Sequence, residues 1–343
     1  MDESTSVKRV KIRFPEISSK SWEHPADRAA LTALRRVPGL DLLLQKLVGA
    51  TTERSLRLIT LASSVRVGVN QFPRIHRLHL EACNILDVAS PPELYVTQTP
   101  FLNARAVGVD RPFIVLNSSM VESMSDEELL SVIGHELGHC LSGHVLYKTV
   151  LAMLLRFTTL AFSIPLGGAS LLAVIIALRE WDRKSELSAD RAALLVAQDP
   201  NVCYQLEMKL AGGSNIGEMD INEFFVQAAE YQGSGNVLDS VYKLLNLMGQ
   251  THPFPVLRLA ELKGWVDSGA YQKILNGEYI RRAQEADDDV LKNFRDAANK
   301  YREDFSSNRD PLSDSLRTAA EAAESVKNRA REAFEAIFGK DKE

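Results

Sequence analysis

Cysteine is scarce in this sequence, and its net charge is small. Only three cysteines, Cys83, Cys140 and Cys203, occur among the 343 residues. An odd number of widely spaced cysteines predicts neither a disulfide framework nor a cysteine-rich metal site, and a reducing compartment is the simpler interpretation. The formal net charge of −5 at pH 7 gives no reason to expect nucleic acid as a partner.

A secretion signal is not recognisable at the N-terminus. Residues 1–14 carry charges of both signs and lack the apolar segment that a signal peptide requires. We therefore expect the protein to be cytoplasmic, with the inner face of a membrane as the alternative location. The length allows one large domain or two modest ones, each with a substantial core.

What the sequence does contain is an H-E-x-x-H pattern, formed by His135, Glu136 and His139. On a helix, positions four apart share a face, so both imidazoles can reach one metal ion. Glu136 is then placed to accept a proton from a water held at that ion. An N-cap at Ser125 and an apolar stripe predict a helix from about residue 126 to at least 145. Two core histidines on an ordinary helix are the alternative. On such a continuous helix His144 would face away from His139, which makes it a poor fourth ligand.

One long stretch, residues 157–178, has no charged residue and is long enough to cross a membrane. Residues 165–168 interrupt it with proline and glycine, which indicates a turn. If the following Glu186 shares a site with His139, a single crossing would separate the two residues. Because residues 149–178 are too few for two crossings, they predict an apolar helical hairpin. Its tip packs against protein, which we favour, or dips into a membrane face.

Short β-rich segments precede the histidine helix. Residues 94–97, 104–109 and 113–116 predict a small antiparallel sheet beside the cleft. An exposed edge of this sheet could hold an extended peptide, and a plain structural hairpin is the alternative. The remaining segments have helical periodicity, so we expect an α+β fold that is predominantly α.

Four segments, in this order, resemble zinc metallopeptidases of the M48 family, which includes HtpX-like and CAAX-prenyl-protease-like enzymes. They are Asn103-Ala104 before the strand pair, His135 through His139, Glu186 through Asp190 as E-x-x-x-D, and His252-Pro253 through Arg258 as H-P-x-x-x-x-R. The resemblance implies a zincin-like fold and one Zn²⁺ per chain. It also implies His135, His139 and Glu186 as the zinc ligands, with Glu136 as general base.

The same resemblance suggests roles for residues around the metal. Asp190 would orient a ligand, and Arg258 would pair with an acid near the cleft. His252 would be a second catalytic residue that stabilises the oxyanion. Asn103 and Ala104 would lie on the strand edge that meets the substrate.

These observations predict a zinc-dependent metalloendopeptidase that hydrolyses peptide bonds of protein or peptide substrates through a zinc-activated water. The alternative is a non-catalytic, zinc-stabilised scaffold that recruits a partner or membrane through the hairpin or the C-terminal helix. Peripheral membrane contact or a homo-oligomer would then involve residues 149–178. We divide the chain into an N-terminal tail or arm (1–27), an M48-like peptidase domain (28–270) and a charged helical extension (271–343).

Overall fold

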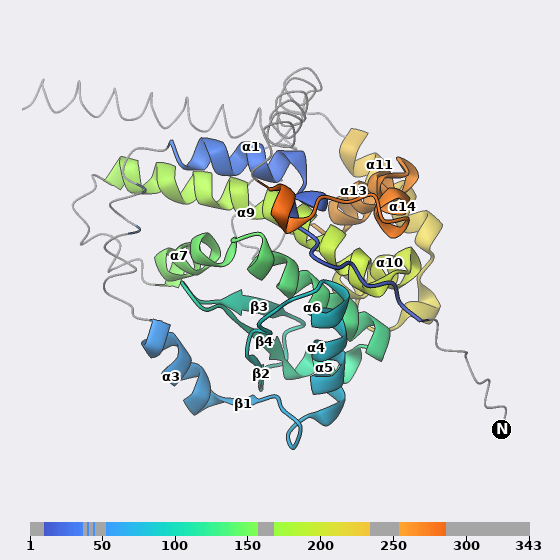
Figure 1. The fold of residues 1–343 in the computed structure, drawn as a ribbon. Helices are drawn as coiled ribbons and strands as arrows, with labels where there is room; N and C mark the ends of the chain where they lie inside the picture. Colours follow the sequence, from blue (N-terminus) through green and yellow to red (C-terminus); the bar gives the residue numbers. More distant parts are fainter. Residues whose placement is uncertain are drawn as a thin grey trace, which may run out of the picture.

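The computed structural model describes residues 10–36, 53–156, 168–233 and 254–285, together with Leu40 and Leu44. Figure 1 shows helices gathered around α6 and α9, with a small sheet against one side of them. The elements, in chain order, are η1 (Ser19–Ser21), α1 (Pro25–Leu34), α3 (Glu53–Ser63), β1 (Ser64–Arg66), α4 (Pro73–Ile85), β2 (Leu94–Thr97), β3 (Ala104–Val107), β4 (Phe113–Asn117), α5 (Ser118–Ser123), α6 (Asp126–Leu141), α7 (Val145–Arg156), α9 (Gly168–Ala197), α10 (Pro200–Gly212), η2 (Ile216–Glu218), α11 (Ile221–Gly233), α13 (Pro255–Asp267), α14 (Ala270–Leu275) and η3 (Arg282–Gln284). The fold is therefore predominantly helical with a small sheet, as expected.

The sheet is mixed, so the prediction of an antiparallel sheet is wrong in part. Its strand order is β1-β2-β4-β3. β3 and β4 form the predicted antiparallel hairpin, and β1 pairs antiparallel with β2. β2 and β4 run parallel, because the chain leaves β2, forms β3 at the outer edge and only then turns back into β4. All five residues of β4 are buried, as expected for a central strand.

Helix α6 begins as predicted and ends earlier than predicted. Ser125 and Glu128 form a capping box at its start. The helix ends at Leu141, and Gly143 adopts a left-handed φ of 70° before α7 begins. Glycine takes this conformation at little cost, so the chain turns here instead of continuing as one helix. This turn changes the direction in which His144 points.

Close packing of α6 on α9 depends on two glycines of α6. A Cβ atom at Gly134 would lie 2.7 Å from the Val196 Cβ, and one at Gly138 would lie 2.7 Å from the Ala192 Cβ. Real Cβ atoms do not approach this closely, so the glycines let the two helix backbones come together. This approach brings Glu186 of α9 to the histidines of α6.

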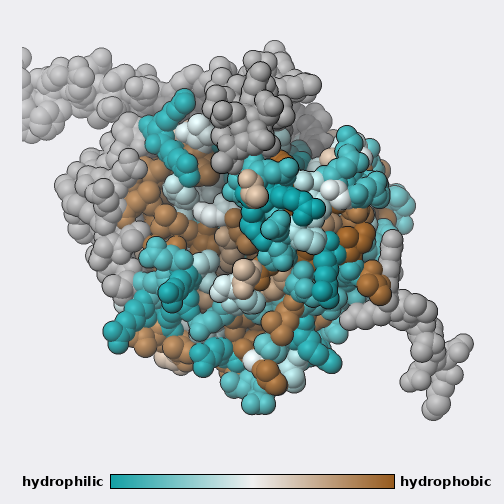
Figure 2. Space-filling view, viewed as in Figure 1, coloured by the Kyte–Doolittle hydropathy of each residue, from teal (hydrophilic) through white to brown (hydrophobic). Residues whose placement is uncertain are grey.

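The segment predicted to form an apolar hairpin contains α7 and the first part of α9, and the hairpin itself stays a prediction. Figure 2 shows hydrophobic side chains gathered over these two helices. A separate apolar cluster joins α7 and α9 to α1: Leu34, Leu40, Val150, Leu151, Leu154, Val174, Leu178 and Trp181. The described arms of the hairpin therefore pack on protein, whereas its tip, residues 157–167, lies outside the described residues. None of the described helices has the length and apolar character needed to cross a membrane.

Residues near both ends of the described chain join the main body. Phe14, Ile17 and Trp22 are buried in the main core together with Tyr271 and Ile274 of α14. The backbones of residues 18 and 280 are hydrogen bonded at 2.9 Å. In the part of the chain that the structure describes, residues on both sides of the predicted boundaries at 27 and 271 belong to one core. The division into three parts stays a prediction, since residues 1–9 and 286–343 lie outside the described chain.

Candidate metal centre

Helices α6 and α9 bring His135, His139 and Glu186 together in the interior. His135 Nε2 lies 3.3 Å from Glu186 Oε2, and His139 Nε2 lies 3.2 Å from Glu186 Oε1. One potential ligand atom from each residue lies within 4.8 Å of the other two, and all three side chains are buried. Ligand atoms arranged tetrahedrally about 2.0–2.1 Å from one zinc ion are separated by roughly 3.3 Å. The spacing of this candidate metal centre therefore suits zinc.

The imidazole of His139 also fits a metal chemically. His139 Nε2 is buried and makes no hydrogen bond to any residue that the structure describes, although it faces a carboxylate oxygen. Burial and the charge of Lys148 hold the pKa of His139 well below its ordinary value, so its imidazole is neutral. A neutral imidazole with an accessible lone pair is the form that binds zinc.

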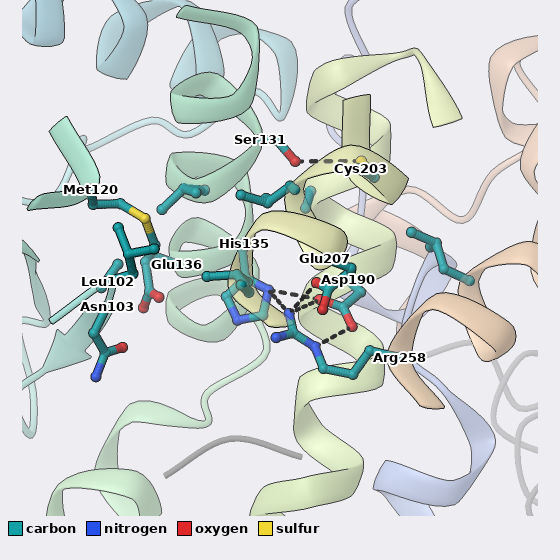
Figure 3. Close-up of a pocket in the computed structure, with 16 residues that line it drawn as sticks. Leu102, Asn103, Met120, Ser131, His135, Glu136, Asp190, Cys203, Glu207 and Arg258 are labelled. Atoms are coloured by element: carbon teal, nitrogen blue, oxygen red, sulfur yellow. Dashed lines mark hydrogen bonds and ion pairs between the residues drawn. The ribbon is translucent and has the colours of Figure 1, made fainter. Parts of the chain in front are cut away.

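A charged network holds His135 from the opposite side (Figure 3). His135 Nδ1 lies 3.0 Å from Asp190 Oδ1, and Arg258 Nε donates to Asp190 Oδ2 at 2.9 Å. Arg258 Nη2 also donates to Asp190 Oδ1 and pairs with Glu207 Oε1 at 3.1 Å. Burial alone would lower the pKa of His135, but its hydrogen bonds to Asp190 and Glu186 raise it to about 10. Burial likewise favours neutral Asp190, and the charge of Arg258 outweighs it and lowers the pKa of Asp190.

Besides Glu207, three residues around the centre were not identified as site residues from the sequence. His144 Nδ1 lies 3.0 Å from His139 Nδ1, and His144 Nε2 lies 2.9 Å from Asp27 Oδ2. Lys148 Nζ donates to Glu186 Oε1 at 2.5 Å and to Asp182 Oδ1 at 2.7 Å. The one local feature that could have indicated that His144 points back toward α6 is Gly143, because glycine favours a turn.

A cavity of about 50 Å³ opens beside the centre. His135 and Glu136 line it, together with Asn103 and Ala104 at the start of β3. Figure 3 shows Glu136 and Asn103 on the same side of His135, with the Arg258 network on the other side. The remaining wall is largely apolar and includes Leu102, Met120, Val132, Leu206, Leu210 and Leu262.

Comparison with known proteins agrees with this geometry. The model of peptidase family M48 matches residues 70–266. The chain belongs to peptidase family M48. The matched segment contains His135, Glu136, His139 and Glu186, so the family match and the assembled centre coincide.

Curated relatives of this M48 chain are peptidases. The chloroplastic plastoglobule-localized metallopeptidase 48 of Arabidopsis thaliana is 35% identical over 270 residues, which cover 77% of this chain and 77% of the relative. The protease HtpX homolog 2 of Methanosarcina mazei is 23% identical over 228 residues, covering 57% of this chain and 74% of the relative. The mitochondrial metalloendopeptidase OMA1 of Arabidopsis thaliana is 29% identical over 135 residues, which cover 37% of this chain and 27% of the relative. No solved structure matches the chain at a comparable level.

The structure brings together most of the residues expected from the M48 resemblance. Asp190 contacts a proposed ligand, Arg258 pairs with Asp190, and Asn103 and Ala104 line the cavity. His252 lies outside the described residues, so its role at the oxyanion stays a prediction.

Proposed function

We propose that this M48 peptidase is a zinc-dependent metalloendopeptidase that holds one zinc ion with His135, His139 and Glu186. The convergence of two imidazole nitrogens and one carboxylate on a single buried point carries the proposal. Three protein ligands leave a fourth position for a non-protein ligand, which is the arrangement of catalytic zinc sites. When bound, zinc would lower the pKa of a water to about 7 and polarise the scissile carbonyl.

Glu136 supplies the proton transfer in this proposal. It follows His135 on α6, is buried with 2% exposure and lines the cavity. Its carboxylate accepts a proton from the attacking water and then delivers that proton to the leaving nitrogen. Asp190 and Arg258 keep His135 oriented, and Lys148 holds the Glu186 carboxylate in place.

Strand β3 supplies the binding edge for the substrate. It is the last strand in the sheet order, and Asn103 and Ala104 line the cavity where it begins. An extended peptide that adds to this edge would place its backbone next to Glu136. Binding along a strand edge does not require a chain end, which supports cleavage within a chain rather than at its terminus.

The experiment that tests the proposal compares Glu136→Gln with Glu127→Gln. Glu136→Gln should retain one equivalent of zinc and lose about 10²–10⁴-fold in the cleavage rate of casein or a peptide library, as expected for loss of a general base. Glu127 lies on the same helix with a side chain 42% exposed, so Glu127→Gln should cleave at the wild-type rate. Wild-type cleavage by zinc-loaded Glu136→Gln would refute the role of Glu136.

The non-catalytic scaffold remains the alternative function. It would be favoured if the wild-type chain bound zinc but cleaved no peptide in this assay. The buried position of Glu136 beside the centre supports the peptidase instead, because a purely structural zinc site needs no base.

The plastoglobule location belongs to the Arabidopsis relative. For this chain, a cytoplasmic location with the inner face of a membrane as the alternative stays a prediction. Membrane contact or self-association through residues 149–178 also stays a prediction.

A further inference from the structure

A second buried network lies behind His139, on the side away from Glu186. His139, His144 and Asp27 are 0%, 1% and 2% exposed. They form a chain in which the two Nδ1 atoms of the histidines lie 3.0 Å apart and His144 Nε2 lies 2.9 Å from Asp27 Oδ2. Asp27 belongs to α1, which lies outside the segment matched by the family model.

The surroundings of Asp27 fix the direction of its hydrogen bond with His144. Trp181 Nε1 donates to Oδ1 at 3.0 Å, and Ser188 Oγ donates to Oδ2 at 2.6 Å. Burial favours neutral Asp27, but its contact with His144 and its hydrogen bonds from Ser188 and Trp181 outweigh burial and lower the pKa of Asp27. An ionised carboxylate only accepts hydrogen bonds, so His144 Nε2 must be the donor.

The proton positions then follow along the chain. Zinc binding through His139 Nε2 requires a lone pair on that atom, so the single proton of a neutral His139 must lie on Nδ1. His139 Nδ1 then donates to His144 Nδ1 at 3.0 Å, which leaves the proton of His144 on Nε2, the atom that donates to Asp27. The hydrogen-bond direction that Asp27 requires is therefore the one that a zinc-binding His139 needs.

We propose that Asp27 and His144 are positioning residues that fix His139 in its metal-binding tautomer and orientation. This inference rests on the proposed zinc site. His135 has its own partner in Asp190, so each imidazole ligand is held through its Nδ1 by a separate network. The N-terminal helix α1 thereby completes a site whose other named residues come from the family-matched segment.

Asp27→Asn tests the hydrogen-bond directions sharply. The Trp181 indole can only donate, so the amide oxygen of the new side chain must face it. The amide NH₂ then faces His144 and donates to Nε2, which reverses the chain and places a proton on His139 Nε2. Asp27→Asn should therefore weaken zinc binding about 10–100-fold, the usual effect of changing a residue that orients a ligand.

Adding Trp181→Phe separates this effect from a packing defect. Without the indole donor, the amide can turn its oxygen toward His144, and the original tautomer becomes available again. The double variant Asp27→Asn/Trp181→Phe should bind zinc more tightly than Asp27→Asn alone, although it has lost more native contacts. A purely structural role for Asp27 predicts the opposite order.

His144 provides an independent pair of variants in case the Asp27 variants do not fold. The Oδ1 atom of His144→Asn can replace Nδ1 as the acceptor for His139, whereas His144→Leu leaves no acceptor. Zinc affinity should fall in the order wild type, His144→Asn, His144→Leu. His79→Gln is the matched control, because it replaces another buried histidine that lies outside both networks. It should leave zinc affinity unchanged.

The measurement is zinc affinity of the full-length chain by competition with a chelating dye. The ¹⁵N chemical shifts of His139 in the zinc-free protein, which report its tautomer, provide the second measurement. We expect an Nδ1-protonated His139 in the wild type and an Nε2-protonated His139 in Asp27→Asn. Equal zinc affinities, an unchanged tautomer in Asp27→Asn, or no recovery in the double variant would overturn the inference. A wild-type chain that binds no zinc would instead refute the proposed function.

Discussion

Glu186 and Asp190 lie one turn apart on α9, yet their neighbours differ. Glu186 faces the Nε2 atoms of both histidines, whereas Asp190 contacts His135 Nδ1 and pairs with Arg258. An isolated E-x-x-x-D pattern contains no such distinction, because both carboxylates lie on one helical face. The separate roles arise from what packs against each carboxylate.

This difference predicts unequal effects on metal binding. Glu186→Ala removes one of three proposed protein ligands, so zinc should be lost on dialysis. Asp190→Ala should weaken affinity by about 10–100-fold and leave zinc bound at saturating concentration. Metal analysis and dye competition measure both effects. Loss of zinc from Asp190→Ala but not from Glu186→Ala would exchange the two roles.

Glu207 predicts a pH dependence of stability. Burial raises the pKa of Glu207 to about 8, against the opposing charge of Arg258. The ordinary carboxyl value is 4.5. Between these values the folded state retains a proton that the unfolded state has released, so the free energy of unfolding falls as pH rises. Glutamine cannot titrate, so Glu207→Gln should gain stability relative to the zinc-free wild type as pH rises from about 5 to about 8. Urea unfolding at several pH values measures this gap, and a constant gap would contradict the assignment.

At the scale of the elements, the α6–α9 contact determines whether the ligands can meet. The short approach at Gly134 and Gly138 is possible only without side chains. Glycine inside a helix costs about 1 kcal/mol relative to alanine. Close packing of the two helices offsets that cost. The same approach places Glu186 within reach of both histidines.

Gly138→Ala tests this contact against Gly264→Ala. An alanine Cβ at 138 would meet Ala192 and Ala189, and such overpacking typically costs about 1–3 kcal/mol. We expect lower stability and weaker zinc binding, because α9 must move away from α6. Gly264 in α13 has nothing within 4 Å of its Cβ position, so Gly264→Ala should be neutral or stabilising and should leave zinc affinity unchanged. Thermal unfolding and dye competition report both properties, and equal behaviour of the two variants would contradict this account.

At the scale of the whole molecule, distant parts of the chain build the site and its supporting core. α1 lies against α9, α13 contributes Arg258, and residues 14–22 pack with residues 271–280. The core that positions the site therefore extends on the N-terminal side beyond residues 70–266, which the family model matches.

Local patterns predicted the local parts of this structure. The N-cap at Ser125, the H-E-x-x-H helix and the β3–β4 hairpin depend on neighbours close in sequence, and all three are present. The parallel pairing of β2 with β4 and the contact of Asp27 with Ser188, 161 residues away, depend on tertiary packing that periodicity does not encode. The end of α6 was missed because the apolar pattern continues past Gly143 into α7.

The most direct test of the central claim is X-ray absorption at the zinc edge of the zinc-loaded full-length chain. The account predicts two imidazole nitrogens, one carboxylate oxygen and one further non-protein oxygen at about 2.0–2.2 Å. Glu136→Gln should give the same shell of neighbours, because Glu136 is not a ligand. A sulfur neighbour at about 2.3 Å, or a shell closed by four protein ligands, would contradict a catalytic centre built from His135, His139 and Glu186.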